Sequence, residues 1–108
     1  MRTTVTARHC AVPDELRVRA RELVGRLAKV ASRPHDAQVI FGADHGAAEV
    51  EVRLHTARGR VHVATAGGPD HRSALDRAVA RVRRQLDKAP ARKPRARRAR
   101  RPPAREPR

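Results

Sequence analysis

The sequence has almost no aromatic side chains. It contains no Trp and no Tyr, and its one Phe is Phe41, at the end of the largely apolar run 37–41. Modules that read single-stranded RNA stack unpaired bases on several exposed aromatic rings. We therefore exclude that class of nucleic-acid binder and expect Phe41 to lie in the core.

Cysteine and long apolar runs are also scarce. Cys10 is the only cysteine, so no internal disulfide can form, which fits a reducing cytoplasm. No apolar run approaches the roughly 18 residues of a membrane-spanning helix, so no membrane partner is expected.

Recognisable catalytic or metal-binding patterns are missing as well. The six histidines lack the spacing of zinc ligands, and no carboxylate pair or nucleophile-base set stands out. We expect no metal, no cofactor and no small-molecule substrate, and hence a protein that is not an enzyme.

Acidic residues are few compared with basic ones. Lys and Arg number 26 against 11 Asp and Glu, which gives a net charge of +15 over 108 residues. A chain of this length has room for one domain. Such an excess predicts a polyanionic partner, most often nucleic acid, which is held through its phosphates.

The charge is unevenly distributed along the chain. Residues 90–108 carry nine cations, one acid and five prolines without a large apolar side chain, which predicts a disordered Arg/Pro-rich tail. Residues 1–89 carry 17 cations and 10 acids, a net of +7, and are expected to form the folded domain. The folded part is therefore basic without the tail.

The hydrophobic pattern predicts a β-α-β-β-β-α order. The expected strands cover residues 3–7, 37–41, 48–55 and 60–66, and the expected helices cover 14–33 and 70–88. Because each strand has one apolar side, both helices must cover the same face of a four-stranded sheet. This is a two-layer α+β domain, in which the first two strands are joined by a right-handed crossover.

Alternation also assigns faces within the strands. Val50, Val52 and Leu54 are expected to face the helices. In the last strand we place Val61 and Val63 on that same inner face, with His55 and His62 close together on the outer face.

The last helix combines an apolar stripe with a row of cations. Its apolar residues repeat at intervals of three and four: Leu75, Val79, Val82 and Leu86. Its cations repeat in the same way, half a turn away: Arg77, Arg81, Arg84 and Lys88. Asp70 is the expected N-cap. The pattern is typical of a helix that packs on a core and presents its other side to an anionic partner.

Three segments resemble the ribosome hibernation-promoting factor and ribosome-associated inhibitor A family in its short form. They are VTARHCAVPDELRVRARELVGRLAKV, VEVRLHTARGRVHVATAG and DHRSALDRAVARVRRQL, within a resemblance that covers residues 3–88. One departure is the run Asp70-His71-Arg72, which stands where the family usually has Asp-Met-Tyr.

The resemblance implies a cytoplasmic, non-enzymatic stress-response protein that is monomeric in solution. It would bind the small ribosomal subunit across the tRNA and mRNA sites, contact rRNA backbone, inhibit translation and protect idle ribosomes. By position, the implied contacts are Arg8, Arg17, Arg26, Lys29, Arg81, Arg84 and Lys88, and the helical row adds Arg77. The alternative is a general DNA- or double-stranded-RNA-binding protein of the nucleoid type, because a basic face without aromatics also suits a duplex.

Overall fold

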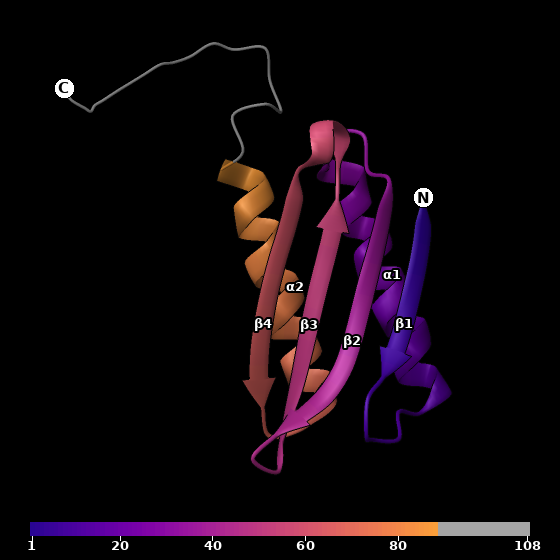
Figure 1. Ribbon diagram of the computed structural model, residues 1–108, viewed down its shortest axis with the longest axis vertical. Coiled ribbons are helices and arrows are strands. Elements are labelled where there is room, and N and C mark those ends of the chain that lie inside the picture. The colour runs from indigo at the N-terminus through magenta and orange to yellow at the C-terminus, as the bar shows by residue number, and fades with distance from the viewer. Residues whose placement is uncertain (89–108) are drawn as a thin grey trace, which may run out of the picture.

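The computed structural model describes residues 1–88 and confirms the predicted order of elements (Figure 1). The elements are β1 (Arg2–Ala7), α1 (Asp14–Val30), β2 (Asp36–Asp44), β3 (Ala47–His55), a 3₁₀ turn η1 (Ala57–Gly59), β4 (Val61–Gly68) and α2 (His71–Lys88). The predicted tail, residues 90–108, lies outside the described residues.

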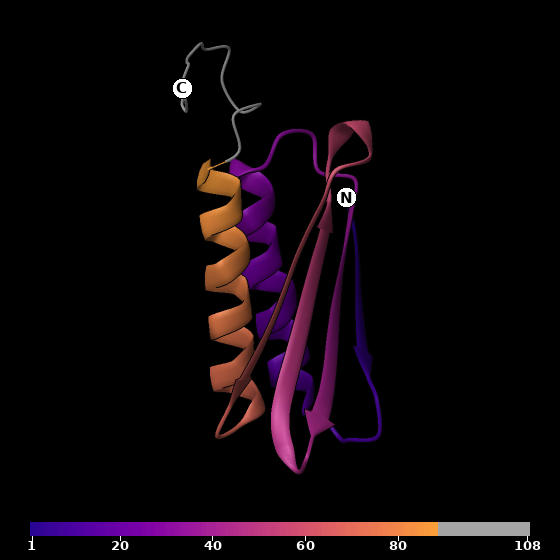
Figure 2. The same ribbon diagram turned by 60° about the vertical axis from the view of Figure 1, so that its left-hand side comes forward.

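The four strands form one sheet in the order β1-β2-β3-β4. β1 pairs in parallel with β2, whereas β3 is antiparallel to both of its neighbours. Figure 2 shows both helices on the same side of this sheet, which confirms the two-layer α+β architecture. β1 and β4 are the two edge strands.

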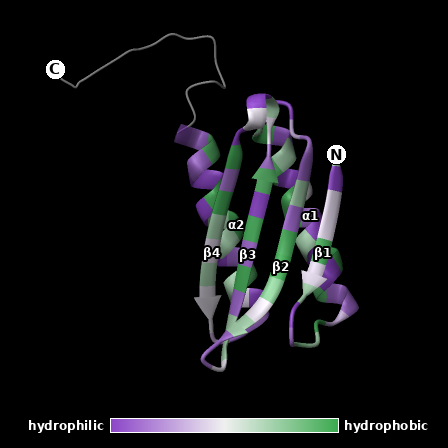
Figure 3. Ribbon diagram, in the orientation of Figure 1, coloured by the Kyte–Doolittle hydropathy of each residue, from purple (hydrophilic) through white to green (hydrophobic). Residues whose placement is uncertain are grey.

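The core fills the space between the sheet and the helices. Green apolar segments alternate with purple polar ones along β3 in Figure 3, as the sequence pattern predicts. The largest fully buried side chains are Phe41, Leu54, Leu75, Leu86, Val24, Val39, Val50, Val52 and Val82. Phe41 is therefore a core residue. In α1, Ala20, Val24 and Leu27 are buried, and Leu16, Leu23 and Val30 pack partly buried against the core.

The predicted faces of β4 are wrong. Val61 and Val63 are 46% and 40% exposed, whereas Ala64 and Ala66 are buried. The register with β3 is the cause, because directly opposite residues in an antiparallel pair point to the same face. The inward residues of β3 thus bring the alanines inward, although the valines are the more apolar residues.

The same register separates two histidines that the sequence placed together. His62 pairs with the buried Leu54 and shares its face, whereas His55 pairs with Val61 on the outer face. The expected neighbouring pair on the outer face does not form.

The strands are also longer than predicted at one end of the sheet. The segment 42–46 is not an irregular loop, because β2 runs to Asp44 and the two residues His45 and Gly46 turn the chain with φ of 53° and 81°. Two positive φ values in a two-residue hairpin are typical of a type I′ turn, which suits twisted strands. β4 likewise continues through Gly67 and Gly68.

Candidate nucleic-acid interface

The first turn of α2 is fixed by Asp70. Its Oδ1 accepts a hydrogen bond of 2.8 Å from the Ser73 backbone N–H, as expected of an N-cap. This backbone hydrogen bond is the main cause that lowers the pKa of the Asp70 carboxyl below its ordinary value. The helix therefore starts at a defined residue, which sets where its cations lie.

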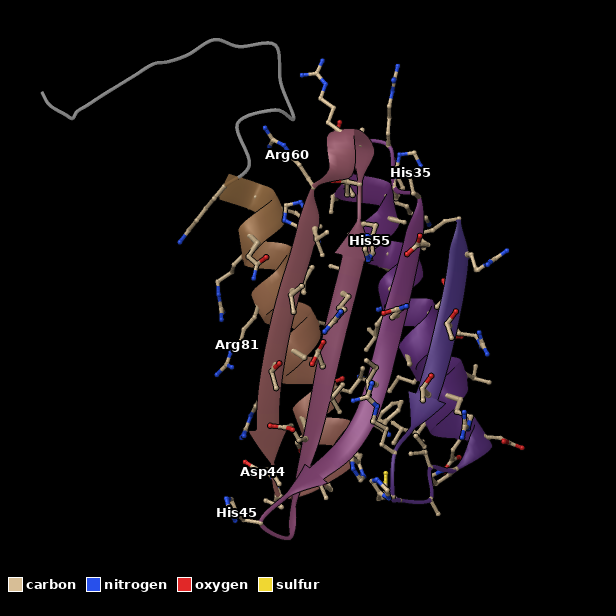
Figure 4. The ribbon with its side chains drawn as sticks, in the orientation of Figure 1. His35, Asp44, His45, His55, Arg60 and Arg81 are labelled. Carbon is tan, nitrogen blue, oxygen red and sulfur yellow. The ribbon has the colours of Figure 1, made fainter. Side chains whose placement is uncertain are left out.

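Part of the cationic row of α2 is bound to the sheet. Three side chains donate to carbonyl oxygens along the free edge of β4: Arg77 Nη1 to Gly67 at 2.8 Å, Arg81 Nη1 to Thr65, and Gln85 Nε2 to Val63 at 2.8 Å. Figure 4 shows Arg81 on the β4 side of the molecule. We call these three residues the edge ladder.

The spacing of the edge ladder follows from backbone geometry. Four residues of helix rise about 6 Å, and two residues of strand span about 6.6 to 6.8 Å. Every fourth side chain of α2 therefore meets every second carbonyl of β4 as the two elements run antiparallel. Unpaired carbonyls on an edge strand attract other strands, and the ladder occupies three of them.

The opposite edge of the sheet has a shorter version of this arrangement. Arg17 Nη1 donates to the Val5 carbonyl oxygen at 3.4 Å, and Arg21 Nη1 donates to that of Thr3 at 3.2 Å. The pairs again combine a step of four on the helix with a step of two on the strand. Each edge strand is thus covered by arginines of the helix beside it.

The remaining predicted contact residues have free side chains. Arg8, Arg26, Lys29, Arg84 and Lys88 are exposed. No carboxylate lies within ion-pair distance of any of them among residues 1–88. They are therefore available to an anionic partner without first losing an interaction.

The eight predicted contact residues do not form one cluster. Arg77 and Arg81 lie at the β4 edge of the sheet, whereas Arg17 lies at the opposite edge, beside β1. Arg8 follows β1 directly. The C-terminal ends of α1 and α2, with Lys29 and Lys88, lie side by side in Figures 1 and 2.

A shallow groove separates the outer sides of the two helices. It has a volume of about 270 Å³ and is lined by Arg19, Leu23, Arg26, Leu27, Asp76, Val79, Ala80 and Arg83. Arg19 Nη2 and Asp76 Oδ1, 3.0 Å apart, form an ion pair across it, and Arg83 pairs with Asp87 at 3.4 Å. Of the three arginines, Arg26 is therefore the one with a free charge.

His71, in the first turn of α2, contacts strand β2. Its ring packs edge-on against Phe41 with centroids 5.8 Å apart, and Nε2 donates to the Gly42 carbonyl oxygen at 2.7 Å. His71 therefore links the start of α2 to β2 through a ring contact and a hydrogen bond.

The basic environment affects one histidine on β4. Burial lowers the pKa of His62 below its ordinary value, the charge of Arg60 lowers it further, and a hydrogen bond with Gln85 opposes the shift. The surroundings of His62 therefore disfavour its charged form.

Residues 1–88 contain neither a cluster of metal-binding side chains nor a membrane-spanning helix. No group of three or more His, Cys, Asp and Glu side chains there could hold a metal ion. No helix of residues 1–88 is both long and apolar enough to cross a membrane.

The sequence analysis did not single out four basic side chains and one amide that the structure places at the sheet edges or on the connections. Arg21 and Gln85 belong to the edge contacts, and Arg33, Arg58 and Arg60 lie on the connections at one end of the sheet. The continuation of the four-residue spacing from Arg81 to Gln85 was a usable signal. For Arg33, Arg58 and Arg60 the sequence offered no such signal, because hydrophobic periodicity does not predict the conformation of loops.

A comparison of the sequence with protein families identifies a known group. The Sigma 54 modulation protein / S30EA ribosomal protein family matches residues 3–93, and the chain therefore belongs to that family. This confirms the resemblance inferred from the sequence, and it makes the protein a member of a ribosome-associated family.

Solved structures share the fold. The N-terminal domain of Protein Y from Thermus thermophilus is 21% identical, with a TM-score of 0.68, and the match covers 79% of this chain and 93% of that one. A ribosomal subunit interface protein from Coxiella burnetii is 18% identical, with a TM-score of 0.65 and coverage of 82% and 96%. No curated protein sequence matches the chain.

Proposed function

We propose that this protein binds the small ribosomal subunit across the tRNA and mRNA sites and contacts rRNA backbone through its helices. It inhibits translation there and protects idle ribosomes, without an enzymatic activity. Membership of the S30EA ribosomal protein family is the observation that carries this proposal. The neighbour from Coxiella burnetii, described as a ribosomal subunit interface protein, adds support at the level of the fold.

The charge of the helix layer supports the proposal. Arg26, Lys29, Arg84 and Lys88 are exposed and have no carboxylate partner among the described residues. Phosphate contacts by such side chains release counterions and supply most of the sequence-independent affinity for nucleic acid. Arg77 and Arg81 each use one nitrogen on β4, and a guanidinium has further N–H donors for a phosphate. Arg8 and Arg17 extend the proposed contact towards β1.

A competition experiment tests the ribosomal function against general nucleic-acid binding. Labelled protein is bound to purified small subunits at physiological salt, and duplex DNA is then added in excess at matched phosphate concentration. We expect the protein to stay on the subunit in the presence of DNA and to leave when tRNA and mRNA are added together. Displacement by DNA would favour the nucleoid-type alternative.

A second measurement addresses the outcome of binding. Translation of a reporter mRNA by purified ribosomes is measured with the protein present before or after initiation. Occupation of the tRNA and mRNA sites predicts inhibition only when the protein is added first. Equal inhibition in both orders would contradict binding at these sites.

A further inference from the structure

One end of the molecule gathers cations from four separate elements. It is formed by the C-terminal ends of α1 and α2, the connection between α1 and β2, and η1 (Figures 1 and 2). Its exposed cations are Lys29, Arg33, Arg58, Arg60, Arg84 and Lys88. We call this group the basic end. Figure 4 places Arg60 there, beside the last turns of α2.

Three of these residues lie outside both helices. Arg33 follows α1, Arg58 lies within η1, and Arg60 directly precedes β4. No carboxylate of residues 1–88 is within ion-pair distance of their guanidinium groups. Cations at helix C-termini compensate the helix dipole, which accounts for Lys29 and Lys88. Dipole compensation does not explain Arg58 and Arg60, which are at no α-helix end.

The two connections form an ordered platform. The Ala57 N–H donates to the Ser32 carbonyl oxygen at 3.4 Å, which joins η1 to the α1–β2 connection. The Thr56 N–H donates to the Arg60 carbonyl oxygen at 2.9 Å, and Thr56 itself is buried. The backbone beneath the three arginines is therefore held in place, and their side chains extend from a fixed base.

Backbone conformation provides an independent observation. Arg33 and Arg58 have φ of 50° and 64°, in the left-handed region that suits glycine and is sterically costly for other residues. Residues in such conformations cluster at functional sites. Glycine would satisfy both backbones, so what arginine adds at these positions is its charged side chain.

The opposite end of the molecule has a different character. It carries acidic residues at the start of each helix and at the β2–β3 turn, including Asp14, Asp44 and Asp70, together with the cations Arg8 and Arg72. Charges of both signs are therefore mixed at this end. A polyanion is attracted more strongly to the basic end.

We propose that Arg33, Arg58 and Arg60 contact the phosphodiester backbone of the RNA bound by the helices, so that the interface continues around the basic end. This inference rests on the proposed function and extends its contact surface from the helix layer to the connections of the sheet. The sequence after Lys88, with nine cations in residues 90–108, leaves the described part of the chain at this same end.

The salt dependence of binding tests this surface. The variant Arg58→Gln with Arg60→Gln is compared with Arg53→Gln with Arg72→Gln, which lowers the net charge equally. Arg53 pairs with Glu51 on the outer sheet face, and Arg72 lies at the start of α2. Affinity for purified small subunits is measured over a range of salt concentrations for both variants and for the wild-type protein.

We expect the first variant to reduce the slope of log affinity against log salt by about 1.5, since each lost phosphate contact lowers it by about 0.7 to 0.9. The matched control should keep the wild-type slope, and Arg58→Lys with Arg60→Lys should restore most of it. The variant Arg58→Gly, which suits a φ of 64°, removes one charge without backbone cost and should lower the slope by about half as much.

Two results would overturn the inference while leaving the proposed function intact. One is a wild-type slope in the Arg58/Arg60 variant, and the other is an equal loss in the matched control, which would mean that only net charge matters. If duplex DNA displaces the wild-type protein from the subunit, the ribosomal function fails, and the RNA contact proposed here fails with it.

Discussion

Arg81 and Arg84 lie less than one turn apart on α2, yet the structure gives them different surroundings. Arg81 donates to the Thr65 carbonyl oxygen at the edge of β4, whereas Arg84 is exposed and has no carboxylate partner among residues 1–88. The same contrast separates Arg77 from Lys88. Cations of one helical row therefore divide into an edge-bound group, whose guanidinium groups already donate to carbonyl oxygens of the sheet, and a free group, whose side chains make no such hydrogen bond within residues 1–88.

The largest expected effect is a loss of ribosome binding when residues of the free group are substituted. Arg84→Glu with Lys88→Glu should weaken small-subunit affinity about a hundredfold or more. A hydrogen bond to a charged group contributes about 1.5 to 3 kcal/mol, and about 1.4 kcal/mol corresponds to tenfold. Equilibrium binding to purified subunits measures the effect. Urea unfolding should show a loss of only about 1 kcal/mol, because acids replace cations near the C-terminus of α2. An affinity within twofold of wild type would contradict a role for the free group.

The edge-bound group should instead matter for stability. Arg77→Ala with Arg81→Ala removes two hydrogen bonds to β4, which at an exposed edge should lower the free energy of unfolding by about 1 kcal/mol. The uncovered strand should also promote self-association. Urea denaturation and sedimentation velocity measure both effects. Unchanged stability together with a monomeric protein would show that the two arginines are not fastened to the edge in solution.

A comparison of neighbouring residues makes the distinction sharper. Gln85 is an uncharged member of the edge ladder, so Gln85→Ala should lower stability by about 0.5 kcal/mol and leave the salt dependence of binding unchanged. Arg84→Ala should do the reverse, because it removes a charge without a hydrogen bond to the sheet. The division into two groups would be wrong if both variants changed the same property.

The smallest expected effect is electrostatic and local. Arg60→Gln should raise the pKa of His62, because the Arg60 charge disfavours the imidazolium form. An NMR titration of the His62 ring in both proteins measures the change. An identical titration would mean that Arg60 points away from β4 in solution.

The same lowered pKa of His62 has a consequence for stability. Because the folded-state pKa lies below the unfolded value near 6.5, the contribution is fully present above that value. It is lost as pH falls through the folded-state pKa. His62→Gln should therefore flatten the pH dependence of unfolding between about pH 7 and pH 5.

Much of the fold could be predicted from local patterns. An apolar run identified β2, alternation identified β3 and its inner face, and the three-and-four spacing identified both helices. The faces of β4 could not be predicted in this way, because both of its faces carry apolar residues. The pairing of Val52 with Ala64 decides which face of β4 points towards the helices, and this pairing is a contact between strands.

The candidate site was less predictable than the fold. The helical row correctly identified exposed cations, and the family resemblance gave the partner class. Neither could separate Arg81 from Arg84, since both occupy the same kind of position in the helical repeat. The gathering of Arg33, Arg58 and Arg60 at one end could not be predicted either, because the connections that carry them have no periodic pattern.

The sequence by itself determined the excess of positive charge, the order of the elements and the membership of a ribosome-associated family. Composition, periodicity and family motifs are properties of the chain that need no coordinates. Only the tertiary structure decided which cations are free. Small buried residues on both elements, Ala74 and Ala78 on α2 and Ala64 and Ala66 on β4, let the helix lie close to the edge strand. The side chains within reach of that edge bind its carbonyl oxygens, and those beyond reach remain available to phosphate.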